Sequence, residues 1–276
     1  MSIIRRLVAA VVVLAAFGAS PSVFAEELVV PGSGNPEYVL KVLAEAFNAQ
    51  QALHRVLVPT STGTGGALRD VEAGTATLAR VGRPLKSDEL ARGLVYIPIG
   101  RDPVTFVGGS GVTVKDLTQA QLIDVYTGRV TNWQAFGGKP GPIRVIGRES
   151  TDSSRQAINR GIQPFERIVF GDAVKVVHLD PQMVELLDRF PGSLGFLNRS
   201  ALAAAKTKLV YLSLDGVPST PQNVGAGRYP LWLEFGFIHK AGKLGPAATA
   251  FVDFVRSSAG VRILREQGIL AAASPS

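Results

Sequence analysis

The sequence contains no cysteine among its 276 residues. The fold therefore has no disulfide bonds and depends on its hydrophobic core, which the 46% of hydrophobic residues are sufficient to build. Catalysis by a cysteine nucleophile is excluded for the same reason. No lipid can be attached to a cysteine after the N-terminal segment, so this route of membrane anchoring is excluded as well.

The sequence also lacks a hydrophobic run of the ~20 residues that a membrane-spanning helix needs. The apolar run at 7–17 is shorter; it follows Arg5 and Arg6 and is followed by Val-Phe-Ala at 23–25. This pattern is typical of a cleavable secretory signal peptide; the alternative is an uncleaved anchor helix. We predict a signal peptide over 1–25 and a periplasmic location. Cleavage would leave 251 residues, with a net charge of +5 instead of +7.

Several chemical signatures are missing from the rest of the chain. The Lys and Arg residues are spread out and form no dense block, so we expect no nucleic-acid partner. His54, His178 and His239 have no metal-ligand spacing and are interpreted as surface or strand residues. No Gly-x-Ser-x-Gly elbow and no Gly-Lys-Ser/Thr phosphate-binding loop occurs. We expect no metal, no cofactor and no enzymatic activity.

Short β-rich runs alternate with helical patterns, which predicts an α/β architecture. The predicted strands are Leu28–Val30, Arg55–Val58, Val95–Ile99, Ile143–Ile146 and Val174–His178. A first helix is predicted with Asn35 as its N-cap and Pro36 in its first turn. Further helices are predicted from about Gly65 to Ala73 with Thr64 as cap, from Asp152 to before Gly161, and from Pro246 to Gln267.

Glycine and hydroxyl-bearing residues precede three of these helices. The segments are 32–35 (GSGN), 61–65 (STGTG) and 148–155 (RESTDSSR). A helix N-terminus offers unpaired N–H groups and a partial positive charge, which favour an anion. Hydroxyl groups and the planar fork of an arginine add donors suited to an oxyanion. Ordinary capping and turn chemistry is the alternative interpretation of each segment.

Longer motifs resemble those of a known family. Residues 117–148 read LTQAQLIDVYTGRVTNWQAFGGKPGPIRVIGR, and STGTGGAL, GRPL, PGSLGF and FVDFVRSSAGVRILREQGIL occur elsewhere in the chain. In content and order they resemble the phosphate-type solute-binding proteins of ABC transporters, within the type II periplasmic-binding superfamily. The resemblance extends over nearly all of the chain after the signal segment.

This resemblance implies two α/β lobes, joined by two hinge crossings, with a ligand cleft between them. The first lobe would contain 26–100 and 226–276, and the second 101–225. The crossings would lie near Arg101 and Gly225. Trp133 would serve packing, and Tyr38, Tyr126 and Trp232 are interpreted as core or surface aromatics.

The resemblance also places the ligand contacts on this chain. One loop, a second loop and the turn after a strand would supply them. The residues are Ser33, Gly34, Asn35, Thr64, Gly65, Arg148, Asp152, Ser153 and Ser154. Arg148 would be the charged contact, Ser153 would donate its backbone N–H, and Ser154 its hydroxyl.

Two positions depart from the family pattern. Many phosphate binders have an Asp that accepts a ligand proton where this chain has Gly82. Conversely, Asp152 stands where the family has Ser. Asp152 either accepts a ligand proton in place of the missing Asp or only caps its helix and faces away from the ligand. Arg83 is either a second anion contact or a solvated surface charge.

Three functions follow as hypotheses. The first is a monomeric binding protein that captures a small oxyanion, phosphate first among them, and passes it to an ABC permease in the inner membrane. The second is a sensor or scavenger of the same fold that acts with a signalling partner. The third is a phosphate-ester hydrolase, which would need a nucleophile or metal set that the sequence does not contain.

Overall fold

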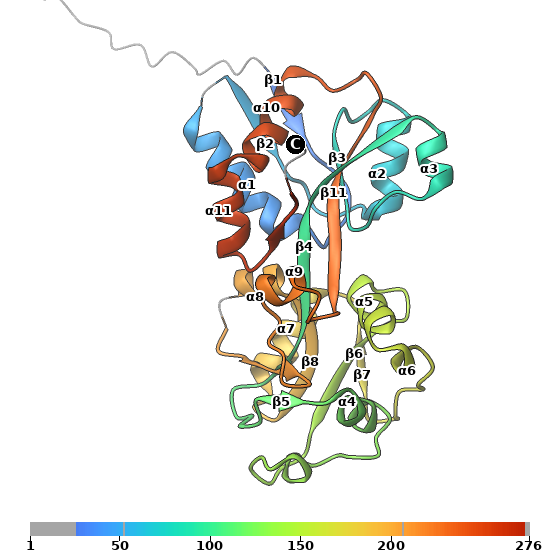
Figure 1. Cartoon of the computed structure of the whole chain (residues 1–276), viewed down its shortest axis with the longest axis vertical. Helices are drawn as coiled ribbons and strands as arrows, with labels where there is room; N and C mark the ends of the chain where they lie inside the picture. The colour runs from blue at the N-terminus through green and yellow to red at the C-terminus, as the bar shows by residue number, and fades with distance from the viewer. Residues whose placement is uncertain (1–25, 52, 206, 274–276) are drawn as a thin grey trace, which may run out of the picture.

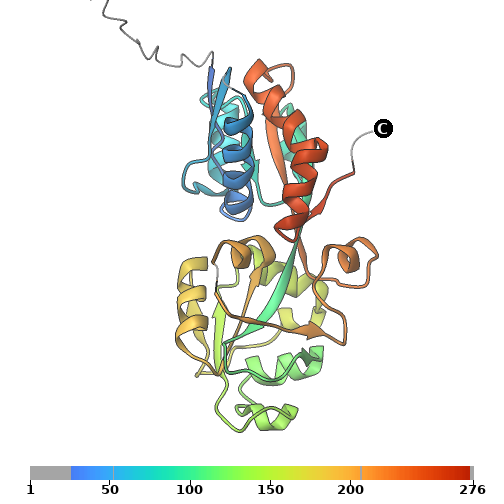
Figure 2. The same cartoon turned by 90° about the vertical axis from the view of Figure 1, so that its left-hand side faces the viewer.

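The computed structural model describes residues 26–273 except 52 and 206. The predicted signal peptide over 1–25 lies outside the described residues. The chain forms two lobes, one above the other in Figure 1 and separated at mid-height in Figure 2. Among the described residues, no helix is both long enough and apolar enough to span a membrane.

The upper lobe of Figure 1 contains both ends of the described chain. Its strands are β1 (Glu26–Val29), β2 (His54–Leu57), β3 (Ala79–Val81), the greater part of β11 (Trp232–Lys240), and β12 (Leu270–Ala271). Its helices are α1 (Glu37–Gln50), α2 (Gly63–Glu72), α3 (Ser87–Ala91), α10 (Pro246–Arg256) and α11 (Ser258–Glu266).

The lower lobe is built from the middle of the chain. Its strands are β5 (Asp116–Leu117), β6 (Arg144–Arg148), β7 (Lys175–Val177), β8 (Ser193–Asn198), β9 (Val210–Tyr211) and β10 (Ser213–Leu214). Its helices are α4 (Gln119–Tyr126), α5 (Ser153–Gly161), α6 (Gln163–Glu166), α7 (Asp180–Arg189), α8 (Arg199–Ala205) and α9 (Pro221–Gly225), with a 3-10 turn at Trp133–Phe136.

One long strand, β4 (Leu94–Gly108), connects the two lobes. Its first part pairs antiparallel with β11, and its last five residues, Val104–Gly108, pair antiparallel with β8. The main sheet has the order β3-β11-β4-β8-β6-β7, in which β6 is parallel to both β7 and β8. Because β4 and β11 extend from one lobe to the other, they connect the two lobes (Figure 1).

Each lobe has hydrophobic clusters of its own. In the upper lobe, one cluster joins α1, α10 and α11 to the sheet, with Phe47, Phe237 and Phe251 at its centre. In the lower lobe, Phe106, Tyr126 and Phe196 pack together with their rings inclined to one another. These aromatic groups bury large areas and hold the strand ends that carry the site.

All five predicted strands overlap strands of the structure, but three details of the predicted helices were wrong. The segment from Pro246 is two helices, because Ser257 ends α10 and its side chain caps α11 through the N–H of Gly260. Helix α1 starts at Glu37 after Pro36, and the side chain of Asn35 does not cap it. Helix α2 likewise starts at Gly63, before the predicted cap Thr64.

Candidate functional site: a polar cleft between the lobes

A cleft of about 890 Å³ lies between the lobes and is lined by residues from both. The upper lobe contributes the loop before α1, the loop before α2 and the turn after β3. The lower lobe contributes the turn between β6 and α5 and the start of α7. Most of the predicted contacts line this cleft: Ser33, Gly34, Asn35, Thr64, Arg83, Arg148, Asp152 and Ser153.

Arg80 holds the upper wall in place. It is fully buried in β3, and its guanidinium donates to the backbone carbonyls of Val30, Ser33 and Pro59. Its remaining partner is the carboxylate of Glu37, at 3.3 Å. Burial lowers the pKa of Arg80, and the charge of Glu37 opposes this shift. One cation therefore ties together the two loops that supply cleft donors.

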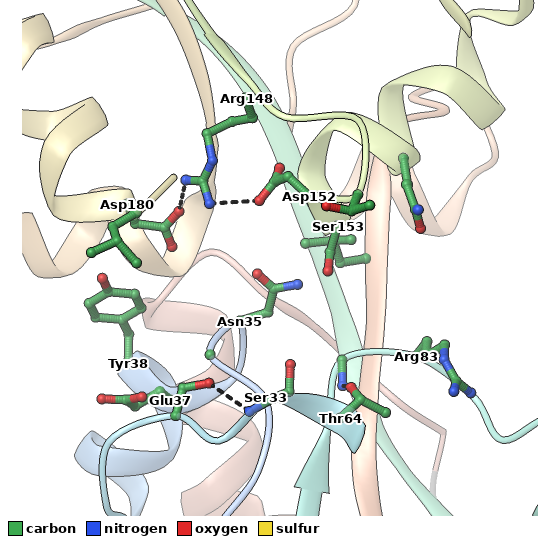
Figure 3. Close-up of a pocket in the computed structure, with 18 of the residues that line it drawn as sticks. Ser33, Asn35, Glu37, Tyr38, Thr64, Arg83, Arg148, Asp152, Ser153 and Asp180 are labelled. Atoms are coloured by element: carbon green, nitrogen blue, oxygen red, sulfur yellow. Dashed lines mark hydrogen bonds and ion pairs between the residues drawn. The ribbon is translucent and has the colours of Figure 1, made fainter. Parts of the chain in front are cut away.

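The first loop requires glycine at position 32. Gly32 has φ +130°, and a Cβ there would lie 2.0 Å from the carbonyl oxygen of Arg80. Only glycine combines this conformation with this close approach. The next residue, Ser33, donates its N–H to the same carbonyl oxygen at 3.0 Å. The loop is thus fixed against β3, with the side chain of Ser33 on the cleft side (Figure 3).

Donor groups gather on this upper wall. The Oγ1 of Thr64 accepts a long bond, 3.4 Å, from the N–H of Gly82. A Cβ on Gly82 would lie 2.6 Å from the Oγ of Ser33. The amide Nδ2 of Asn35 is buried without a hydrogen-bond partner in the part of the chain that the structure describes. An unpaired buried donor beside an open cleft is a group that a ligand oxygen would satisfy.

Arg148 occupies the opposite wall at the end of β6. It is 6% exposed, and its guanidinium donates to Asp180 and to the carbonyl oxygen of His178 at 3.0 Å, and forms an ion pair with Asp152 at 2.7 Å (Figure 3). Its Nε, also buried, has no partner among the described residues. Two carboxylates already share the charge of this buried cation, and the unpaired Nε leaves one buried donor for a ligand.

Asp152 performs two tasks at once. One carboxylate oxygen caps α5 by accepting the N–H of Arg155 at 3.0 Å, and the other pairs with Arg148. Burial raises the pKa of Asp152, the charge of Arg148 opposes the rise, and that of Asp180 adds to it. Asp152 therefore caps its helix, as one interpretation held, but it does not face away from the cleft; acceptance of a ligand proton stays a prediction.

The sequence analysis did not single out Asp180, and it interpreted Tyr38 as a core or surface aromatic. Asp180 is the first residue of α7, and its carboxylate lies in the cleft against Arg148. Tyr38, on α1, lines the same cleft and points toward Asp180 (Figure 3). Burial, followed by the charge of Asp180, raises the pKa of Tyr38 to about 12. The Asp-Pro pair at 180–181, before an apolar helix pattern, was the available signal for Asp180.

The other predicted contacts have different surroundings. Arg83 lines the cleft, but both of its terminal nitrogens pair with Glu89, at 2.8 and 2.7 Å. The hydrogen bonds from Arg83 lower the pKa of Glu89 to about 2, so the charge of Arg83 is already neutralised. Gly65 lies in the first turn of α2, and Ser154 is buried in α5; neither is among the cleft-lining residues.

The aromatic residues also divide into two groups. Trp133 and Tyr126 are buried packing residues, as predicted, and donate to the carbonyl oxygens of Gly192 and Ile146. Trp232 is half-buried and lines the cleft, with the guanidinium of Arg101 4.2 Å from the centre of its ring; whether it contacts a ligand is untested. Among the described residues, no group of three His, Asp or Glu side chains is arranged to hold a metal ion.

This fold and site define a class of protein, the solute-binding proteins with two lobes and a cleft between them. The chain belongs to the PBP superfamily, because the family model "PBP superfamily domain" matches residues 19–259. The predicted fold class is thereby confirmed.

Two curated proteins and one solved structure are similar to this chain over most of its length. The chain is 26% identical to "Phosphate-binding protein PstS" of Bacillus subtilis over 241 residues, which are 83% of this chain and 75% of that protein. It is 24% identical to a protein of the same name from Borreliella burgdorferi over 194 residues, or 68% and 70% of the two chains. A solved structure, a putative phosphate ABC transporter substrate-binding protein with bound phosphate from Clostridium perfringens, has a TM-score of 0.76 at 24% identity, and the match covers 90% of this chain and all of that one.

Proposed function

We propose that this protein captures inorganic phosphate in the cleft between its lobes and delivers it, outside the cytoplasm, to an ABC permease. The observation that carries the proposal is Arg148, a buried cation on one wall that faces the hydroxyl and amide groups of Ser33, Asn35 and Thr64 on the other. A small oxyanion can contact both walls at once, because it presents acceptors in all directions. The names of the relatives favour phosphate among such anions.

The proposal includes several finer statements. The lobes comprise 26–100 with 226–276 and 101–225, and the protein acts as a monomer without a cofactor or catalysis. The segment 1–25 directs export to the periplasm and is removed. A sensor or scavenger role remains the alternative, since it would use the same cleft with a different partner.

The decisive experiment identifies the ligand directly. Purified protein is unfolded in urea, the released small molecules are analysed by mass spectrometry, and the refolded protein is titrated with phosphate, sulfate and molybdate by calorimetry. We expect phosphate to be released and to bind most tightly. Tighter binding of sulfate or molybdate would contradict the choice of ligand. Phosphate uptake is also measured in cells that lack the gene. Uptake should be lost if the protein delivers phosphate to a permease, and it should persist if the protein is a sensor or scavenger.

A further inference from the structure

Two carboxylates, Asp152 and Asp180, share the single guanidinium of Arg148 on the lower wall of the cleft (Figure 3). Their side chains are only 10% and 16% exposed. Within the part of the chain that the structure describes, no other cation lies within ion-pair distance of either one. The cluster therefore carries one positive and two negative charges when both carboxylates are ionised. Such a wall repels an anion that carries no proton.

The two carboxylates differ in how firmly they are held. Asp152 is fixed by its second role as the cap of α5, through the N–H of Arg155. For Asp180, the described contacts include only the bond from Arg148. An ionised carboxylate can only accept hydrogen bonds, so each of the two needs a donor when a ligand enters. Arg148 cannot serve both fully while it also binds the ligand.

Charged and titratable groups from both lobes surround Asp180. Arg148 comes from β6, and Asp152 lies at the start of α5. Tyr38 and Glu37 lie on α1 of the other lobe. At the rim, the ring nitrogen Nδ1 of His178 lies 2.9 Å from the carboxylate of Glu149. The only cation among these groups that touches Asp180 is the one that it shares with Asp152.

Resting on the proposed function, we infer that the cleft binds the monobasic, doubly protonated form of phosphate, and that Asp180 accepts its second proton. Monobasic phosphate has two O–H donors, one for Asp152 and one for Asp180. Its two unprotonated oxygens match the donors of Arg148, Asn35 and Ser33. Dibasic phosphate has a single O–H, so one of the two buried carboxylates would face an unprotonated oxygen of the ligand. Sulfate has no O–H, so both carboxylates would face unprotonated oxygens. Rejection by an unpaired buried polar group is stronger than rejection by size.

The pH dependence of binding tests this assignment. Calorimetric titration with inorganic phosphate at pH 6 and pH 8 compares wild type with Asp180→Asn. Phosphate loses its second proton near neutral pH, so the monobasic fraction falls over this interval. We expect wild type to bind about five- to tenfold more weakly at pH 8, in proportion to the competent ligand fraction. The side-chain amide introduced by Asp180→Asn can donate to an oxyanion, so the variant should change by less than about twofold and should exceed wild type in affinity at pH 8.

The matched control is Asp188→Asn, which removes the same charge from an exposed position on the same helix, α7. It should keep the wild-type pH dependence. A second measurement on wild type alone uses buffers of different ionisation enthalpy and should find nearly one proton taken up per phosphate bound at pH 8. Equal or tighter wild-type binding at pH 8, no proton uptake, or an unchanged slope in Asp180→Asn would overturn the inference while leaving phosphate binding intact. Absence of phosphate binding at every pH would instead overturn the proposed function, and this inference with it.

Discussion

Gly82 approaches Ser33 so closely that a Cβ on Gly82 would lie 2.6 Å from the serine hydroxyl oxygen and 3.4 Å from the Nδ2 of Asn35. Because Gly82 has no side chain, the hydroxyl of Ser33 and the amide of Asn35 can occupy their positions on the cleft wall. This close approach also gives a structural reason why a carboxylate cannot be added here without displacing Ser33. Under the proposed function, the proton acceptors for the ligand are therefore Asp152 and Asp180 on the lower wall of the cleft.

A first prediction concerns Gly82→Ala. The added methyl group should rotate the Ser33 hydroxyl away from the cleft and remove one hydrogen bond to the ligand. Because one such bond contributes about 0.5–1.5 kcal/mol, we expect calorimetry to report phosphate binding about two- to tenfold weaker. Gly141→Ala is the control, since a Cβ there has nothing within 4 Å. Equal affinity of both variants would contradict the role assigned to the close contact.

A second prediction concerns Arg148→Ala. Truncation leaves the anion without its buried cation and leaves two carboxylates unpaired beside it. We expect the binding free energy of phosphate to weaken by about 2–5 kcal/mol in calorimetry. Arg144→Ala, on the same strand but with its guanidinium over the ring of Phe190 at 4.4 Å, should bind as wild type. A loss under about 1 kcal/mol, typical of an exposed pair, would remove Arg148 from the site.

A third prediction concerns Asp152→Ser. Serine is also a good N-cap, so the free energy of unfolding should change by less than about 1 kcal/mol. Removal of the carboxylate should improve sulfate binding and so narrow the preference for phosphate. Competition titrations of the two anions against both proteins measure this. If wild type binds sulfate as well as phosphate, or if the preference is unchanged in the variant, Asp152 does not select the ligand.

Sequence reasoning was most successful where the signal is local. Glycine and hydroxyl residues before a helix, an arginine at a strand end and an aspartate at an N-cap are features of a few consecutive residues. They singled out the segments 32–35, 61–65 and 148–155, and the resemblance to the family then assigned Ser33, Thr64, Arg148 and Asp152 as ligand contacts; the structure places all four on one cleft. Whether they contact a ligand stays a prediction.

The missed residues are those whose role depends on contacts between distant segments. Arg80 resembles an ordinary charge in a short strand, and its burial against carbonyls 21 to 50 residues away in sequence is visible only in the fold. Asp180 and Arg148 are 32 residues apart and meet because β6 and β7 pair in parallel. Tyr38 faces the cleft because α1 borders the other lobe. No periodicity in the sequence encodes these meetings.

A fourth prediction concerns the buried carboxyl of Asp102, where β4 leaves β11 and joins β8. Burial raises its pKa from 3.8 to about 6, against the opposing hydrogen bonds from Ser200 and Asn198. The folded state therefore binds this proton more tightly than the unfolded state. The resulting stability is fully present below about pH 4 and is lost as pH rises to about 6, a change of roughly 2–3 kcal/mol.

Urea unfolding between pH 4 and 7 measures this contribution. Asp102→Asn cannot ionise, so its free energy of unfolding should lack the decline between pH 4 and 6. Asp253→Asn, an exposed position on α10, should retain it. The same decline in both variants would show that another group causes it.

The fifth prediction is closure of the cleft. Its volume of about 890 Å³ far exceeds that of a five-atom oxyanion, so an anion held by Arg148 can reach Ser33 and Asn35 only if the walls approach each other. A ligand that contacts both lobes stabilises the state in which both reach it, and the pair β4 and β11 is the hinge available for this motion. Small-angle X-ray scattering should therefore detect a smaller radius of gyration with saturating phosphate. The Arg148→Ala protein should not contract at the same phosphate concentration, because it lacks the contact that attaches the anion to the lower wall. A wild-type radius of gyration that is unchanged by bound phosphate would mean that the anion binds to one wall alone.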